Sequence, residues 1–445
     1  MFKKTFITLF SLMTLLIAAP VQAQQTDSIS MTLDQALQIA LSDNPSVRVA
    51  DQQIEIQKYA KKETITGLFP TVTAAGTFSD AVVLQKVKLD FAPEPISMGQ
   101  KYTWALNGTV ALPLVAPQLW KTISLNEEQV KLSLESARAS KVEAVTQVKN
   151  AFYSLLLARE SYESLLASQA TAEENATQTR NKYEQGSVSE YDKLTADVQL
   201  ATIKPQVLSA KNGIALAEMQ LKVLMGVDVS TPVRFVGRLA DYEETLFSDL
   251  MKLKADTSLT DNTALRQLDI QQRQLRLAET INKLGYLPTL ALSFQAGYQA
   301  MGKEFNPFDQ AYFGGATLAL SLSWTLFDGG AKYMKTRQNK LQLANTEIQR
   351  ENLVRQLETS IASSLNNIET AAEQVVSNKE NVYSAQRAFE IARKRYDVGS
   401  GTMLELNSSE SNLLTARLQY VQSIYNFLSS RATLENTLGH LVTDK

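Results

Sequence analysis

The sequence predicts a mixed α and β membrane protein in which each chain supplies four transmembrane β-strands and two long, antiparallel helical hairpins. Three observations predict this class. Four segments alternate apolar and small side chains, two long tracts lack proline, and the second half of the chain repeats landmarks of the first.

The clearest strand lies at residues 316–327. Its alternate residues are apolar, and only Ala, Ser and Thr stand between them: Ala316, Leu318, Leu320, Leu322, Trp324 and Leu326 form the apolar set. Such an alternation gives a strand one apolar face. At about 3.3 Å per residue the run crosses a hydrocarbon layer when tilted by about 45°, which is typical of an outer-membrane strand.

The same alternation occurs from Trp104 to Leu114, from Leu290 to Tyr298 and, more weakly, from Val72 to Phe78. Four strands cannot close a barrel, and an open sheet edge in lipid leaves backbone groups without partners, at several kcal/mol each. Other copies of the chain must therefore complete the sheet. Two copies give eight strands and three give twelve, and the small residues on the inward face favour the wider, hollow barrel.

The N-terminus reads as a signal peptide over residues 1–23. Lys3 and Lys4 precede an apolar run from Phe6 to Ala19, and small residues end at Ala23. The run falls short of the roughly 18 to 20 residues of a spanning helix. We expect export, cleavage after Ala23 and a flexible lead over residues 24–30, and no N-terminal lipid anchor because the chain lacks Cys.

Composition argues against catalysis and nucleic-acid binding. The chain has 445 residues, a net charge of -2, no Cys and one His, and no basic tract stands out. The lack of Cys removes disulfides and thiolate metal sites. His440 lies at the end of the chain, and neither a phosphate-binding loop nor a nucleophile motif occurs. We expect no catalytic residue, no cofactor, no metal and no nucleic-acid partner.

Landmarks recur at nearly constant offsets, which predicts a tandem duplication. Asp43-Asn44 recurs as Asp261-Asn262, 218 residues later, and Gly226 recurs as Gly439, 213 residues later. The first repeat covers residues 31–227, with a β-hairpin at about 71–115 and a helical hairpin at about 121–225. The second covers 261–445, with the corresponding hairpins at about 289–327 and 331–441. Residues 228–260 have no counterpart and are expected to form an equatorial collar on the outside of the bundle.

Each helical tract turns back at a glycine. An unbroken helix from residue 121 to 185 is on the order of 100 Å long, and Gly readily takes the left-handed conformation that ends a helix. The two turns contain Tyr183, Gly186 and Ser187, and Gly399, Ser400 and Gly401. Each precedes a capping-box pattern, Ser189 with Asp192 and Thr402 with Glu405.

Aromatic residues gather in or just beyond the strands. They comprise all three Trp residues and three neighbours, namely Trp104, Trp120, Trp324, Tyr298, Tyr312 and Phe313. Confinement of every Trp to these segments favours aromatic belts at the membrane interfaces.

A hollow barrel continuous with a helical tube is a conduit from periplasm to exterior. The paired Tyr-x-x-Gly turns, each with an acid six residues after its Gly and each preceded by a strand hairpin, resemble the TolC family of outer-membrane efflux proteins from Met31 to about Leu441. The resemblance implies a homotrimer with a twelve-stranded barrel and a periplasmic tunnel. It also implies adaptor docking at the hairpin tips and an inner-membrane pump of the resistance-nodulation-division or ABC type.

The resemblance further implies a periplasmic gate at the hairpin tips. Asp192, Tyr396 and Glu405 are the candidates, with a contact between Tyr396 and Asp192 and with Glu405 in a constriction ring. Both acids also occupy capping-box positions, so helix capping is an alternative role. Gly401 and Ser408 stand where some relatives have an Arg and a second acid.

A trimeric surface adhesin is the alternative reading, since it too joins coiled coil to a twelve-stranded barrel. Here, however, strand pairs occur in both halves, and helices that fold back follow each pair. This order places all the helices on one side of the membrane and favours the export channel.

Overall fold

The computed structural model describes residues 29–88, 95–246, 251, 254, 257–306, 308 and 310–441. The expected signal peptide and most of the expected lead therefore lie outside the described residues. The lead ends earlier than expected, because Ile29–Met31 forms strand β1 and pairs in parallel with β6 (Val233–Phe235).

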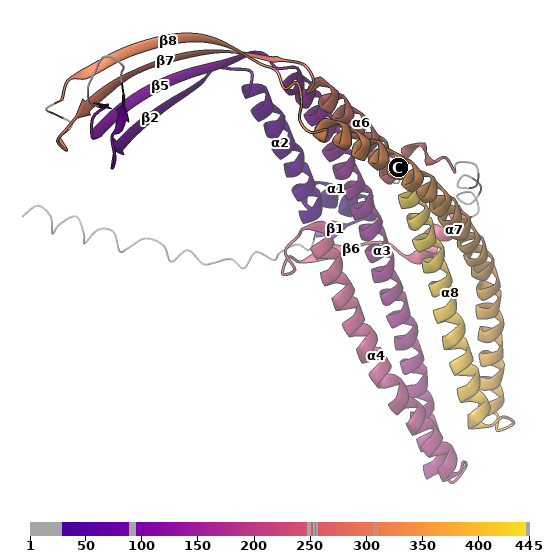
Figure 1. Cartoon of the computed structure of the whole chain (residues 1–445). Helices are drawn as coiled ribbons and strands as arrows, with labels where there is room; N and C mark the ends of the chain where they lie inside the picture. The colour runs from indigo at the N-terminus through magenta and orange to yellow at the C-terminus, as the bar shows by residue number, and fades with distance from the viewer. Residues whose placement is uncertain are drawn as a thin grey trace, which may run out of the picture.

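Two long helical hairpins extend from one end of a sheet (Figure 1). The first joins α3 (Pro117–Glu184) to α4 (Glu190–Met225), and the second joins α7 (Ala331–Asp397) to α8 (Met403–Leu438). None of the helices in the described part of the chain is both long enough and apolar enough to cross a membrane.

Shorter helices continue the shorter arm of each hairpin towards the sheet. α2 (Pro45–Thr66) and α4 both pack on α3, and α6 (Thr263–Leu284) and α8 both pack on α3 and α7. The helices thus form a wall in the order α2 and α4, then α3, then α6 and α8, then α7 (Figure 1).

The sheet contains β2 (Thr71–Asp80), β5 (Tyr102–Val115), β7 (Thr289–Gly302) and β8 (Tyr312–Ser323), all antiparallel and in that order. A small hairpin of β3 (Gln85–Val87) and β4 (Ile96–Met98) lies in the β2–β5 connection. The last strand differs from the predicted 316–327. It begins four residues earlier and ends at Ser323, because Ser323 pairs with Thr289, the first residue of β7.

The register gives the sheet two chemically distinct faces, as the alternation predicts. One row across the four strands contains Val72, Val110, Phe294 and Leu318, and the adjacent row contains Thr73, Thr109, Gln295 and Thr317. Residues directly opposite one another share a face, so apolar side chains gather on one face and small or polar ones on the other.

A collar packs at mid-height of the helices. It consists of β1, α1 (Leu33–Asp43), β6 and two short 3₁₀ helices, η1 (Leu239–Thr245) and η2 (Leu259–Asp261). Phe235 and Leu239 from the collar are fully buried in one core with Phe152 of α3 and Phe427 of α8. Strand β6 lies within residues 228–260, the segment expected to form the collar.

The two halves end in the same way. Gly226 closes α4 with φ 73°, and Gly439 closes α8 with φ 77°. Asn44 donates from Nδ2 to the carbonyl of Leu224 at 2.6 Å, and Asn262 donates to the carbonyl of Thr437 at 2.7 Å. Each hairpin is thereby tied to the start of the helix that leads to its own strands.

Candidate functional site

The tip of the α3–α4 hairpin is a tight turn whose backbone N–H groups form hydrogen bonds within the turn. Gly186 has φ 72°, and the N–H of Ser187 donates to the carbonyl of Lys182 at 2.8 Å. The N–H of Asp192 donates to Ser189 Oγ at 3.1 Å, and the N–H of Ser189 donates to the Asp192 carboxylate at 3.3 Å. This reciprocal pair is the predicted capping box.

The tip of the α7–α8 hairpin is built in the same way. Gly399 has φ 75°, and the N–H groups of Ser400 and Gly401 donate to the carbonyl of Arg395 at 2.9 and 3.1 Å. A Cβ at Gly401 would lie 3.0 Å from Arg395 Cβ, which is a tight contact.

Glu405 caps α8 and also approaches a cation. The N–H of Glu405 donates to Thr402 Oγ1 at 3.2 Å, while Arg395 Nη1 lies 3.7 Å from the Glu405 carboxylate. Both ionic side chains are exposed, so this pair contributes little stability.

Tyr396 contacts the first hairpin, through a residue other than the predicted one. Its side chain is 7% exposed, and its hydroxyl lies 3.0 Å from Thr179 Oγ1. Lys182 Nζ lies 4.5 Å from the centre of its ring. Within the single described chain the hydroxyl of Tyr396 meets buried Thr179 of α3 and not Asp192, and the expected contact between Tyr396 and Asp192 stays a prediction.

Asp192 and Tyr396 nevertheless line one hollow between the two tips. The hollow has a volume of about 650 Å³, and Lys182, Ser189 and Met403 also line it. Above it, Arg393 Nη2 lies 2.6 Å from Glu174 Oε1 and links the hairpins a second time. The two tips are therefore held together by a few polar contacts around a cavity.

Glu410 is a buried acid at the same interface that sequence reasoning missed. It is 3% exposed, and it accepts hydrogen bonds from Ser168 Oγ at 3.0 Å and Asn175 Nδ2 at 3.4 Å. Burial raises the pKa of this carboxyl. Its signal in the sequence is an acid between Leu406 and Leu413, at the three- and four-residue spacing of a buried seam.

The predicted aromatic belt residues lie at two levels of the sheet. Trp104 and Tyr312 are opposite Ala300 in one row near the hairpin ends, and Tyr298 occupies the next row on the same face. Trp324 and Trp120 lie at the other end, by the helices, and Trp324 Nε1 donates to the carbonyl of Tyr286 at 2.9 Å.

Two details of this belt differ from expectation. Phe313 is paired with Gln299 and shares the small-residue face, so it does not stand with the other aromatic residues. Phe78, in contrast, joins the outer level, with its ring centre 5.6 Å from that of Trp104.

Known proteins resemble this chain in sequence and in fold. The family model of the outer membrane efflux proteins matches residues 36–227 and 255–440. Outer membrane protein TolC of Escherichia coli is 22% identical over 338 residues, 72% of this chain and 66% of the relative. The chain therefore spans just under two thirds of that relative. The probable efflux pump outer membrane protein TtgC of Pseudomonas putida is 22% identical over 427 residues, 92% of this chain and 82% of the relative.

Solved structures share the fold. The CmeC outer membrane channel of Campylobacter jejuni superposes with a TM-score of 0.71 at 18% identity, covering 92% of this chain and 85% of CmeC. The open state of the MtrE outer membrane channel of Neisseria gonorrhoeae gives a TM-score of 0.71 at 16% identity, covering 92% of this chain and 89% of MtrE. With the family model matching most of its length, this chain belongs to the outer membrane efflux protein family.

Proposed function

We propose that this protein is the outer-membrane channel-tunnel of a tripartite efflux or type I secretion system. It carries solutes from a periplasmic adaptor and an inner-membrane pump to the exterior. Family membership supports this role, as does the TtgC relative, whose name is that of an efflux pump component. A surface adhesin is less favoured, because both helical hairpins extend from the same end of the sheet (Figure 1).

The main support for the proposal is that the two lateral edges of the chain, which we call its flanks, have unpaired strand edges and exposed apolar side chains. Among the described residues β2 and β8 each pair with one neighbour only. On the flank of β2, α2 exposes Val49 and Ile56. Unpaired strand edges and apolar helix faces both require partners.

The opposite flank, formed by α7 and β8, also exposes apolar side chains. On the β8 side, α7 exposes Met334, Leu341 and Ile348 at intervals of seven residues, and Tyr383 and Ile391 lie exposed nearer the tip. Apolar residues at such intervals form the seam of a coiled coil. The flank of α7 and β8 in one copy therefore fits the flank of α2, α4 and β2 in the next.

A head-to-tail interface closes into a ring when its rotation brings the last copy back to the first, and closure leaves no open sheet edge in lipid. Three copies give a homotrimer with a twelve-stranded barrel, whose apolar face meets outer-membrane lipid and whose small-residue face encloses an aqueous passage. The helices continue this passage into the periplasm as a tunnel. The matching ends of the two halves, at Gly226 and Gly439, support the tandem duplication.

The tips form the proposed periplasmic gate. Asp192 and Glu405 from three copies place six carboxylates near the axis, which attracts cations. Tyr396 holds the second hairpin against the first through Thr179. The turn residues Tyr183, Gly186, Ser187, Gly399, Ser400 and Gly401 present the adaptor-docking surface.

The experiment that tests the proposal is reconstitution in planar lipid bilayers. We expect trimers that conduct, with a cation preference that falls in the pair Asp192→Ala and Glu405→Ala. Protein that inserts but carries no current contradicts the channel role. Because capping is the alternative role of both acids, Asp192→Asn and Glu405→Gln, which remove the charge but keep an acceptor oxygen, separate charge from helix capping.

Assembly is tested with cysteines, because the native chain has none. Ile56→Cys and Leu341→Cys lie in the sheet-side parts of α2 and α7, on opposite flanks. Linking them with a short bifunctional thiol reagent should give a ladder that ends at three copies, and each single variant should stop at two at most. Cleavage of the helices by protease added to intact cells would favour the adhesin.

A further inference from the structure

One face of the α7–α8 hairpin has no charged side chain along much of its length. On α7 it comprises residues three or four apart, on one side of the helix: Asn367, Thr370, Gln374, Asn378, Asn381 and Ala385. On α8 the matching residues are Ser411, Thr415, Gln419, Gln422, Asn426 and Ser429. We call these two rows the uncharged face.

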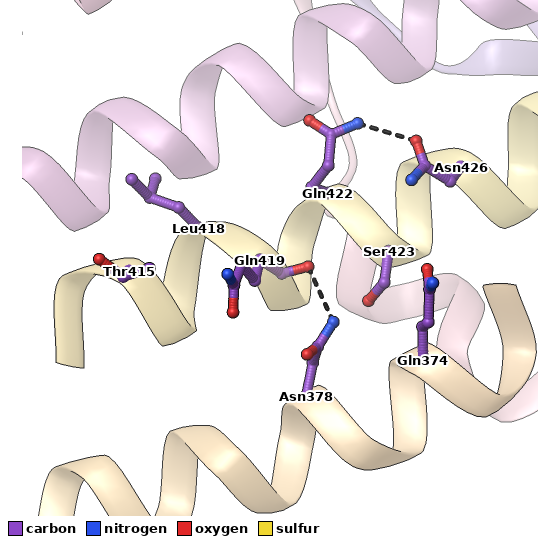
Figure 2. Close-up of a pocket in the computed structure, with 8 residues that line it drawn as sticks. All are labelled: Gln374, Asn378, Thr415, Leu418, Gln419, Gln422, Ser423 and Asn426. Atoms are coloured by element: carbon purple, nitrogen blue, oxygen red, sulfur yellow. Dashed lines mark hydrogen bonds between the residues drawn. The ribbon is translucent and has the colours of Figure 1, made fainter. Parts of the chain in front are cut away.

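The two rows meet in a shallow groove of about 570 Å³, and every residue that lines it is uncharged (Figure 2). Asn378 Nδ2 donates to the carbonyl of Gln419 at 3.3 Å, and Gln422 Nε2 donates to Asn426 Oδ1 at 2.8 Å. These amides therefore bond one another across and along the groove and remain polar towards solvent.

The charges of α8 are segregated from this face. Between residues 406 and 434 its charged side chains are Glu410, Arg417 and Arg431, which are spaced by multiples of seven and thus share one side of a supercoiled helix. Glu410 accepts from α3, and Arg417 Nη2 donates to Gln386 Oε1 at 2.8 Å. All three lie on the packed side of α8, away from the groove.

The collar lies on that other side as well. Glu243 of η1 pairs with Lys379 Nζ at 2.7 Å and accepts from the hydroxyl of Tyr420 at 2.7 Å. Lys379 follows Asn378 in α7, and Tyr420 follows Gln419 in α8. Successive side chains on a helix point about 100° apart, so Lys379 and Tyr420 point away from the groove. This part of the α7–α8 hairpin therefore has a charged side that carries the collar and an uncharged, open side.

We infer that the uncharged face lines the passage of the tunnel. The inference rests on the proposed channel function, because in a closed ring the side that carries the collar is obstructed and the other side is free. Amide and hydroxyl side chains on this face form hydrogen bonds with water in the passage and add no fixed charge to it. It lets neutral, zwitterionic and singly charged hydrogen-bonding solutes pass without ionic capture, and leaves discrimination by charge to the acids at the tips.

The test introduces charge on each side of the wall. In planar bilayers, Gln374→Glu combined with Gln422→Glu should raise the cation-to-anion permeability ratio severalfold at low salt. The corresponding Lys pair should lower it. Both effects should shrink in high salt, since the screening length is about 10 Å at 0.1 M. The matched control is Gln386→Glu, which makes the same change on α7 beside Arg417 and should leave the ratio unaltered.

A second measurement does not depend on the acid variants assembling. In single-cysteine variants, a negatively charged thiol reagent should alter the current through Gln374→Cys and leave Gln386→Cys unaffected. An unchanged ratio and unmodified current in channels that conduct overturn the lining while the channel role stands. Wild-type protein that carries no current overturns both.

Discussion

Glu410 is a buried carboxyl between the two hairpins, and its environment decides how stability depends on pH. Ser168 and Asn175 donate to it, yet burial is the larger influence and raises its pKa above the ordinary value of 4.5. The folded protein therefore holds this proton more tightly than the unfolded chain does. The contribution to stability is complete below pH 4.5 and is lost as pH rises through the raised pKa.

We predict that Glu410→Gln flattens this pH dependence. Relative to the variant, the wild type should lose unfolding free energy as pH rises above 4.5, because only the wild type must ionise a buried group. Thermal melting of the purified protein over a pH series measures the difference. Glu173→Gln, at an exposed position of α3, serves as the control, and parallel curves for wild type and Glu410→Gln contradict the prediction.

Tyr396 and Thr179 form one of the polar contacts that join the two hairpins near their tips, at the proposed gate. A buried hydrogen bond between neutral groups contributes about 1 kcal/mol. We predict that Tyr396→Phe and Thr179→Val are strongly non-additive, with a coupling of about 1 kcal/mol in a double-mutant cycle. Chemical denaturation measures the cycle. Additive losses would show that the two side chains contribute independently.

At the scale of elements, helix ends fix how the halves are joined. Gly226 and Gly439 have positive φ, and a Cβ at either would overlap the carbonyl oxygen of Asp43 or Asp261. Gly186 has the same backbone conformation, but nothing lies within 4 Å of its would-be Cβ. Alanine substitutions at these three positions therefore distinguish the cost of backbone strain, present at all three, from the cost of close packing, present only at Gly226 and Gly439.

We predict that Gly186→Ala costs about 1 kcal/mol of unfolding free energy, from strain alone. Gly226→Ala and Gly439→Ala should each cost more, because the start of α2 or α6 must also move. Melting temperatures measured side by side give the comparison. Equal losses at all three positions would mean that the contact with Asp43 or Asp261 can relax freely.

At the scale of the whole molecule, the flanks decide assembly. Tyr383 on α7 is 71% exposed in one chain and belongs to the apolar flank, whereas its neighbour Ser384 lies off that flank. Burying an unpaired carboxylate in an interface is costly. The two adjacent positions therefore test which side of α7 meets the next copy.

We predict that Tyr383→Asp abolishes the trimer while the helix content of the monomer is retained, and that Ser384→Asp leaves the trimer intact. Light scattering coupled to size-exclusion chromatography gives the mass, and circular dichroism gives the helix content. A trimer in both variants would place the interface elsewhere.

Much of the fold follows from local patterns in the sequence. The four strands and their two faces are encoded in period-two alternation. The long helices α3 and α7 are encoded in tracts without proline after Pro117 and end just before Gly186 and Gly399. The same alternation places Phe313 on the face of Thr317 and on the opposite face from Tyr312.

The sequence by itself determined the elements, their turns and the caps at Ser189 and Thr402, because each depends on residues a few positions apart. Only the tertiary structure decided that Tyr396 meets Thr179, that Glu410 is buried against Ser168, and that β8 ends at Ser323. Those contacts join residues far apart in the chain, and no periodicity specifies which side chain of a neighbouring element comes to face them.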